Sequence, residues 1–128
     1  MPDVLEIFRR EFSKTKFYKP SDSLVVLDRE LYTAIYCADE KSDWRERTRA
    51  GFHAESREIG VIANVKVARH LRKKGYGREM VEAIERVFRQ TGQQISVAKM
   101  VILPEFWEHM GYRLVVENPE EIRAIKRL

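Results

Sequence analysis

The chain has little cysteine and no long hydrophobic run. Cys37 is the single cysteine among 128 residues, so no internal disulfide can form. Its place in "LYTAIYCAD", without a visible activating partner, favours a small packing residue over a reactive thiol. The longest apolar runs, "LVVL" and "VIANV", are far shorter than the roughly 20 residues of a membrane helix, and "MPDVLEIFRR" lacks the apolar stretch of a signal peptide. We therefore expect no membrane span and a cytoplasmic location.

Glycine and proline are also scarce. The 6 glycines and 4 prolines never gather into a linker, and the sequence contains no repeat or low-complexity tract. With 44% hydrophobic and 34% charged residues, the chain has both the apolar mass for a core and the charge for solubility. Residues 1–128 are therefore predicted to form a single domain. The net charge of +4 permits an anionic partner without identifying it.

The first half of the chain predicts one helix followed by strands. "PDVLEIFRREF" places apolar residues on one helical face, and "LVVL" and "LYTAIYCA" predict two antiparallel strands joined by "DRE". In the long polar stretch 39–57, Asp43 and Glu46 have capping-box spacing, which predicts a short helix that ends near Gly51. "REIGVIANVKVA" predicts the next strand.

A long amphipathic helix is predicted from Arg78 onward, with Gly92 as its stop signal. Its apolar stripe consists of Met80, Val81, Ile84, Val87 and Phe88. Two charged pairs at i,i+4 are expected on its solvent side, Glu82 with Arg86 and Glu85 with Arg89.

The rest of the chain predicts a strand in 94–103, a helix in 104–110 and a closing hairpin in 112–128. Strands surrounding a strand, turn, helix and strand unit are typical of the α/β class. Helices on both faces would cover such a sheet, so we expect a three-layer α/β/α sandwich.

A cluster of basic residues and two glycines separates the predicted strand in 57–68 from the long helix. A helix N-terminus offers unpaired N–H groups and the positive end of the macrodipole, and Gly75 and Gly77 let a ligand approach the backbone. The surrounding charged residues are Lys66, Arg69, His70, Arg72, Lys73, Lys74 and Arg78. The segment matches neither a P-loop nor a dinucleotide fingerprint. It predicts a phosphate site, and the alternative is a plain glycine turn with a solvated basic edge.

Two motifs in this order carry a family resemblance. "VARHLRKKGYGREMVEAIE" aligns without a gap with a motif in which a strand ending in valine is followed by Gln/Arg-x-x-Gly-x-Gly/Ala and a helix. Arg72, Gly75 and Gly77 occupy its defining positions, and "FWEHMGYRLV" resembles a later "F-Y-x-x-x-G-F" segment. Both motifs are those of the GNAT superfamily of acetyl-CoA-dependent N-acetyltransferases. The resemblance extends over about 24–128 in element order and implies a GNAT-like acyl-CoA N-acyltransferase fold with a mixed, mostly antiparallel central sheet.

The resemblance implies a cofactor site along the strand end and the following loop. Backbone amides of the 72–78 loop are expected to bind the CoA pyrophosphate, and the backbone of 65–67 to lie along the pantetheine arm. Lys73, Lys74 and Arg78 are expected to add charge near the 3′-phosphate. Acetyl-CoA is therefore the expected cosubstrate, with no metal. The predicted cofactor-binding residues are Val65, Lys66, Val67, Arg72, Lys73, Lys74, Gly75, Tyr76, Gly77 and Arg78.

The catalytic residues of the family are matched in part. Its base is commonly a glutamate on the strand before the loop, where this chain has Val61. Glu58, at the start of the same strand, is the predicted catalytic residue. It lies three residues from Val61 and so on the opposite face, and a surface carboxylate is the alternative. The tyrosine that commonly protonates the departing thiolate is replaced by Trp107, whose indole is no proton source. The tyrosines that remain as donors or core residues are Tyr112, Tyr32 and Tyr36.

Three functions follow from these patterns. The first is an acyltransferase that transfers an acetyl group from acetyl-CoA directly to a primary amine. The second is a GNAT-like acyl-CoA-binding or sensor module with weak turnover or none. The third, a nucleic-acid patch made by the basic cluster, lacks any accompanying RNA or DNA recognition motif. The amine acceptor is unidentified, because its selection lies in the first helix, the 39–57 stretch and the hairpin. The end of the hairpin also favours a homodimer.

Overall fold

The structure is a computed structural model that describes most of the second half of the chain and parts of the first. The described residues are 6–7, 10–11, 14, 23–26, 32–36, 48–66, 75–99, 101, 103–118 and 120–128. The basic segment 67–74 of the predicted cofactor loop lies outside them. No helix in the described part is long and apolar enough to cross a membrane. The cytoplasmic location stays a prediction.

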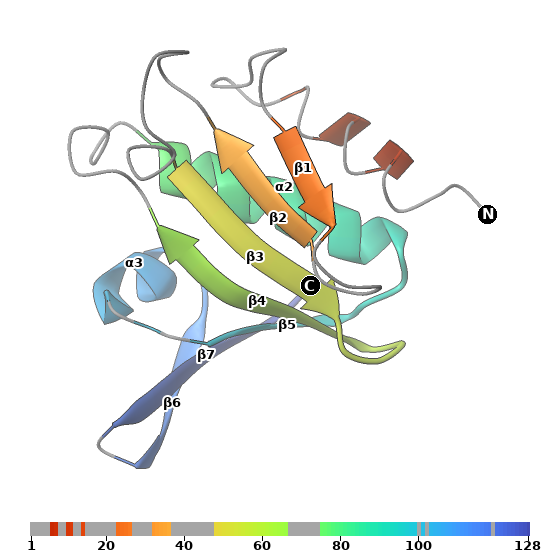
Figure 1. Cartoon of the computed structure of the whole chain (residues 1–128). Coiled ribbons are helices and arrows are strands. Elements are labelled where there is room, and N and C mark those ends of the chain that lie inside the picture. The colour runs from red at the N-terminus through yellow and green to blue at the C-terminus, as the bar shows by residue number, and fades with distance from the viewer. Residues whose placement is uncertain are drawn as a thin grey trace.

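Within the described residues, seven strands form one sheet in the order β1-β2-β3-β4-β5-β7-β6 (Figure 1). Neighbouring strands are antiparallel except β4 and β5, which are parallel. The expected α/β class with a mixed, mostly antiparallel central sheet is therefore confirmed. The strand bounds are β1 Ser23–Val26, β2 Tyr32–Tyr36, β3 Thr48–Ala54, β4 Ile59–Lys66, β5 Ile95–Ala98, β6 Arg113–Asn118 and β7 Glu121–Arg127.

Strand β3 corrects one expectation. The short helix predicted to end near Gly51 is wrong in its described part, because residues 48–54 pair on one side with β2 and on the other with β4. Two alternate residues of this strand, Ala50 and Phe52, are buried in the core. Its remaining residues include a glycine and three charged or polar residues, Thr48, Arg49 and His53, so the sequence shows no clear alternation with a period of two. Residues 43–47 lie outside the described part.

Helix α2, Tyr76–Gln90, lies behind the sheet in Figure 1 and packs on it through the predicted apolar stripe. All five residues of the stripe are buried, so that prediction is confirmed. The ring of Phe88 meets Phe52 edge-on with centroids 6.0 Å apart. Gly60 on β4 makes this approach possible, because a Cβ there would lie 2.5 Å from the Phe88 ring. Gly92, with φ of 93°, follows the helix end as predicted.

The other side of α2 corrects a second expectation. Glu85 is not on the solvent side but is only 2% exposed. Its carboxylate accepts hydrogen bonds from the Tyr112 hydroxyl at 2.9 Å and from Lys126 Nζ at 3.2 Å. The Tyr112 hydroxyl also lies 2.8 Å from Ser96 Oγ. These four residues, called the Glu85 cluster below, tie α2 to β5 and β7.

Helix α3, Pro104–His109, and the hairpin of β6 and β7 agree with the sequence. Pro104 begins the helix at a position where the missing N–H is not needed. Trp107 is buried and meets the Tyr112 ring edge-on, with centroids 5.0 Å apart. In the hairpin turn, the backbone N–H of Glu120 donates to Asn118 Oδ1 at 2.9 Å.

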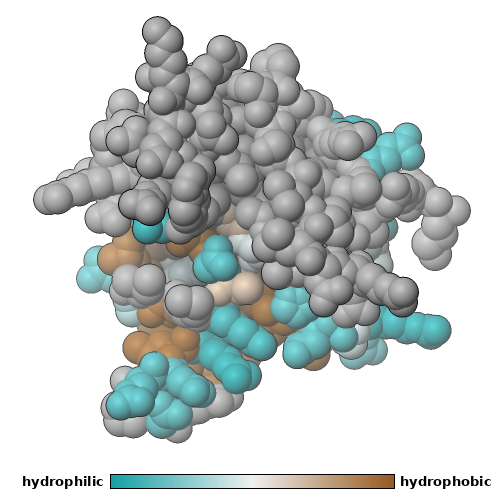
Figure 2. Space-filling model, viewed as in Figure 1, coloured by the Kyte–Doolittle hydropathy of each residue, from teal (hydrophilic) through white to brown (hydrophobic). Residues whose placement is uncertain are grey.

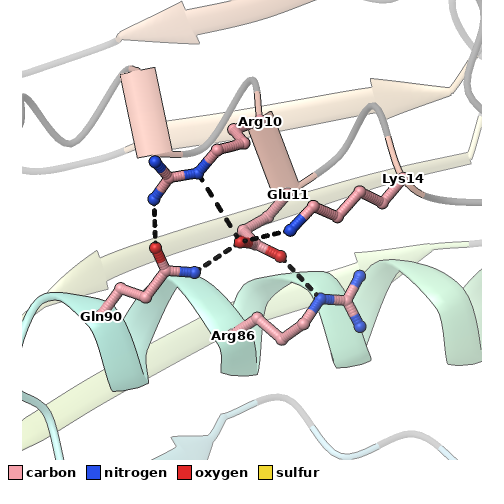
Figure 3. Close-up of polar contacts among 5 residues, drawn as sticks. All are labelled: Arg10, Glu11, Lys14, Arg86 and Gln90. Atoms are coloured by element: carbon pink, nitrogen blue, oxygen red, sulfur yellow. Dashed lines mark hydrogen bonds and ion pairs between the residues drawn. The ribbon is translucent and has the colours of Figure 1, made fainter.

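The N-terminal segment docks on α2 through a buried carboxylate (Figure 3). Residues 6–7 and 10–11 are helical, and Ile7 joins the hydrophobic core. Glu11 is buried and accepts hydrogen bonds from Arg86 Nε at 2.9 Å and from Gln90 Nε2. Lys14 adds an ion pair at 3.3 Å. Burial alone would raise the pKa of Glu11, but the hydrogen bonds from Gln90, Arg86 and Lys14 outweigh it and the pKa is lowered.

This contact predicts an acid-sensitive stability. A carboxyl whose pKa is lower in the folded chain stabilises that chain above its unfolded pKa and loses this contribution as the pH falls through the folded pKa. We expect Glu11→Gln to reduce the free energy of unfolding by about 1–2 kcal/mol near neutral pH and by less near pH 3. Urea unfolding of both chains between about pH 7 and about pH 3 measures the difference. A difference that stays constant or widens on acidification would contradict the prediction.

Candidate functional site

The strands β4 and β5 pair in parallel and then separate. Their register runs from Ile59 opposite Ile95 to Ile62 opposite Ala98. Among the described residues, the last backbone bond between the two segments joins Lys99 N–H to the Ile62 carbonyl at 2.9 Å. Beyond it, β4 continues to Lys66 while β5 ends. The backbone of β4 is therefore no longer paired with β5 along its last residues.

A bulge interrupts β4 at the same level. Asn64 pairs with Gly51 and Ile62 with Phe52, which leaves Ala63 as the extra residue. The side chain of Asn64 takes part, because its Oδ1 accepts a hydrogen bond from Gly51 N–H at 3.2 Å. A bulge re-aims the backbone groups of a strand, and here it does so where β5 diverges.

The N-terminus of α2 points toward this end of β4. Phe88, near the helix end, contacts the position of Gly60 near the start of β4, so the helix runs back along the strand. Gly75 caps the helix with φ of 90°, a left-handed conformation that favours glycine. Its carbonyl accepts Glu79 N–H at 3.0 Å, and its position offers no side chain to cap the first turn. The N–H groups of the first turn of α2 lie at the positive end of the helix dipole.

The structure brings together part of the predicted cofactor site. Lys66 is exposed at the end of β4, Val65 is half-buried against the core, Gly75 is exposed and Gly77 is buried. Arg78 is exposed, and its Nε donates to Glu82 Oε1 at 3.0 Å. Val67, Arg72, Lys73, Lys74 and the Tyr76 side chain lie outside the described residues.

Glu58 lies at the opposite end of β4 from the loop. The strand between them has 8 residues, which corresponds to roughly 25 Å. Glu58 is exposed, and its carbonyl accepts Gln94 N–H at 2.8 Å and Ile95 N–H at 2.9 Å. The structure therefore does not bring Glu58 and the loop together, and its catalytic role stays a prediction without geometric support.

Two departures from the family motif are buried side chains. Val61 is 0% exposed and points to the sheet face opposite α2, since Gly60 and Ile62 on either side face the helix. This face, opposite α2, is turned to the viewer in Figure 2, where its described part shows hydrophobic surface between hydrophilic side chains. Trp107 is 4% exposed within the core. Neither position offers a group that takes up or gives a proton.

Tyr112 is a core residue rather than an accessible proton donor. Burial, together with the charge of Glu85, raises the pKa of its hydroxyl well above the usual range. The side chains of Tyr32 and Tyr36 on β2 lie outside the described residues.

Sequence reasoning missed a cavity of about 400 Å³ on the outer side of α2. It is lined by three arginines of the helix, by the end of α3 and by Lys126 of β7. Four of its helix residues, Arg78, Glu82, Glu85 and Arg89, follow each other at spacings of four, three and four, which marks one face, but no sequence pattern places β7 beside that face.

Comparison with solved structures identifies the fold. No protein-family model matches the chain, and no curated protein sequence does. A putative acetyltransferase of the GNAT family from Desulfovibrio desulfuricans aligns with 100% of this chain and 93% of its own, at 17% identity and a TM-score of 0.61. An aminoglycoside 6′-N-acetyltransferase complexed with coenzyme A aligns over 79% and 74%, at 14% identity and a TM-score of 0.64.

A GNAT family acetyltransferase from Elizabethkingia anophelis with acetyl-CoA bound aligns over 77% of this chain and 75% of its own, at 14% identity and a TM-score of 0.55. The chain has the fold of the GNAT acetyltransferases, as its sequence motifs predicted. At these identities, the likeness establishes the fold alone.

Proposed function

We propose that the chain is an N-acetyltransferase that transfers an acetyl group from acetyl-CoA directly to a primary amine. One observation carries the proposal: β4 leaves β5 beside a bulge at Ala63, and α2 begins toward the same end with Gly75 in a left-handed conformation. The unpaired strand backbone suits an extended amide-bearing arm, and the helix N-terminus suits a pyrophosphate. The neighbours with bound CoA and acetyl-CoA support this choice of cosubstrate.

In the proposed reaction, the chain contributes mainly binding and backbone electrostatics. Acetyl-CoA supplies the acetyl group and a thiolate leaving group. The N–H groups of the first turn of α2 hold the phosphates, and the backbone N–H groups of β4 near Ala63 stabilise the charge that develops on the thioester oxygen. The new C–N bond forms as the C–S bond breaks. The amine loses its proton to solvent, and the thiolate leaves without a dedicated acid, since a free thiol has a pKa near 8.5.

This scheme predicts a pH profile without an enzyme base. A lysine-type amine has a pKa near 10.4, so its neutral fraction rises about ten-fold per pH unit below that value. We expect kcat/KM to rise by about ten-fold per unit between about pH 7 and about pH 9, measured as thiol release from acetyl-CoA in the presence of an amine such as spermidine or lysine. Glu58→Gln is expected to change neither the slope nor the rate by more than about two-fold. A plateau near neutral pH that disappears in Glu58→Gln would instead identify Glu58 as the base.

The buried Val61 and Trp107 favour a second candidate, an acyl-CoA-binding or sensor module without efficient turnover. The two candidates share the binding site and differ in the assay. Tight binding of acetyl-CoA without thiol release above the spontaneous rate, over a broad panel of amines, would select the second. The acceptor amine and the homodimer expected from the sequence stay predictions.

A further inference from the structure

The cavity on the outer side of α2 lies between the end of α3 and β7. Arg78, Arg86 and Arg89 line it from the helix, Lys126 from β7 and His109 from α3. We propose that this cavity binds a compact polyanion that carries phosphate or carboxylate groups, at a site that shares Arg78 with the predicted cofactor loop and extends from it along α2 to Arg89. Its volume of about 400 Å³ is within the usual range for small-molecule sites.

The carboxylates of the cavity are already engaged. Glu85 accepts from Tyr112 at 2.9 Å through one oxygen and from Lys126 at 3.2 Å through the other. Glu82 holds Arg78 at 3.0 Å. The negative charge of Glu85 at the floor of the cavity is therefore balanced by Lys126 before any ligand binds. Few acceptor atoms remain for a cationic ligand.

The cavity has more hydrogen-bond donors on its arginines than its own carboxylates occupy. Arg78 and Arg86 each use only Nε in their hydrogen bonds to Glu82 and Glu11, so among the described residues their terminal nitrogens have no acceptor. Figure 3 shows the terminal nitrogens of Arg86 turned away from Glu11. Arg89 is exposed and makes no hydrogen bond or ion pair within the described part of the chain. Guanidinium groups bind carboxylate and phosphate through two parallel N–H groups, which makes anions of these two kinds the matching ligands.

The position along the helix separates Arg89 from the cofactor loop, whereas Arg78 belongs to both. Arg89 lies 14 residues after Gly75, which at 1.5 Å per residue is roughly 20 Å along α2. The last turn of a helix carries the negative end of its dipole, so it gives no help to an anion. The attraction must therefore come from the arginines themselves, and removal of Arg89 tests it directly.

Calorimetric titration with inorganic pyrophosphate and, separately, with citrate tests the proposal on the full chain. We expect at least one probe to bind, Arg89→Gln to weaken that binding by about ten-fold or more, and saturation with CoA to leave it in place. Pyrophosphate binding alone would assign the site to phosphate, and citrate binding alone to carboxylates. Arg57→Gln removes the same charge from the exposed turn between β3 and β4 and serves as the matched control.

Three results would overturn the proposal. These are no binding of either probe, equal binding by the native chain and Arg89→Gln, and complete loss of binding when CoA is present. The last result would make the cavity part of the CoA site. Because Arg89 is exposed and unpaired within the described residues, Arg89→Gln is expected to fold like the native chain, which thermal unfolding checks. Failure of the proposed acetyltransferase activity leaves this test unaffected, since it uses no turnover.

Discussion

Gly75→Glu is expected to weaken acetyl-CoA binding by at least about 100-fold, while Gly92→Glu leaves it within about two-fold. Gly75 caps the N-terminus of α2, and the proposed phosphate site consists of the N–H groups just beyond it. A carboxylate there brings a negative charge against the phosphates and a side chain into the path of approach. A like-charge contact of about 4 Å near a protein surface costs about 4 kcal/mol, which exceeds what a 100-fold loss requires.

Gly92 is a matched control at the other end of the same helix. Its φ of 93° is close to the 90° of Gly75, so both replacements impose the same backbone strain, about 1–2 kcal/mol. A Cβ at Gly92 meets no atom closer than the Arg57 carbonyl oxygen at 4.0 Å. Both variants also add one negative charge to the chain. In the two variants this charge lies at opposite ends of α2.

Calorimetric titration with acetyl-CoA and with CoA measures the effect, and thermal unfolding compares the stability of the two variants. Equal binding by both variants, at equal stability, would exclude the helix N-terminus as the phosphate site. No binding by the native chain would exclude both acyl-CoA functions. Gly75→Ala, which has the strain without the charge, separates the two contributions if Gly75→Glu fails to fold.

Glu85→Ala is expected to lower the free energy of unfolding by about 3 kcal/mol. Its removal leaves the buried Tyr112 hydroxyl without one of its two partners and Lys126 without its counter-charge. It also opens a void beneath the side chain, because Glu85 is almost fully buried. Loss of one partner from a buried charged pair is costly because the other charge remains in place.

Glu82→Ala is the matched control one turn earlier on α2. It also forms an ion pair, with Arg78 at a similar distance of 3.0 Å, but the side chains of Glu82 and Arg78 are 38% and 71% exposed. Exposed pairs of this kind contribute about 0.2–1 kcal/mol. Urea unfolding of the two variants should therefore differ by about 2 kcal/mol or more. Equal stability would mean that the Glu85 cluster does not hold β5 and β7 to α2, and Glu85→Gln, which keeps the volume and one acceptor, is expected to fall between them.

The long helix and the closing hairpin could be predicted because their signals are local. The apolar stripe of α2 repeats at helical spacing, and Gly92 stops it where the structure ends the helix. Strand β3 could not be predicted in the same way, because "TRAGFHA" alternates weakly and Phe52 is the one large buried side chain among 50–54, the residues whose burial is described. Neighbours on both sides, rather than its own pattern, make it a strand.

The same distinction applies to the site. The place of Gly75 and Gly77 at the start of α2 could be predicted because a glycine turn and the helix after it are consecutive in the sequence. The buried place of Glu85 could not be predicted. Glu85 and Lys126 are 41 positions apart in the sequence, and only the packing of β7 beside α2 brings the two side chains together. The i,i+4 pattern alone predicted that Glu82 and Glu85 are both exposed. In the structure, tertiary contacts bury Glu85, whereas the side chain of Glu82 stays exposed.

The parallel pairing of β4 with β5 also bears on how the chain folds. Strands β1 to β4 form antiparallel pairs between consecutive segments, and β6 and β7 form another. Such pairs close short loops, whereas β4 and β5 meet only after α2 has crossed between them. This junction of two locally assembled halves is therefore expected to form late. Acetyl-CoA bound beside this junction would act as a non-covalent cross-link between the two halves. The ligand that the chain is proposed to use would therefore also favour assembly of the complete sheet.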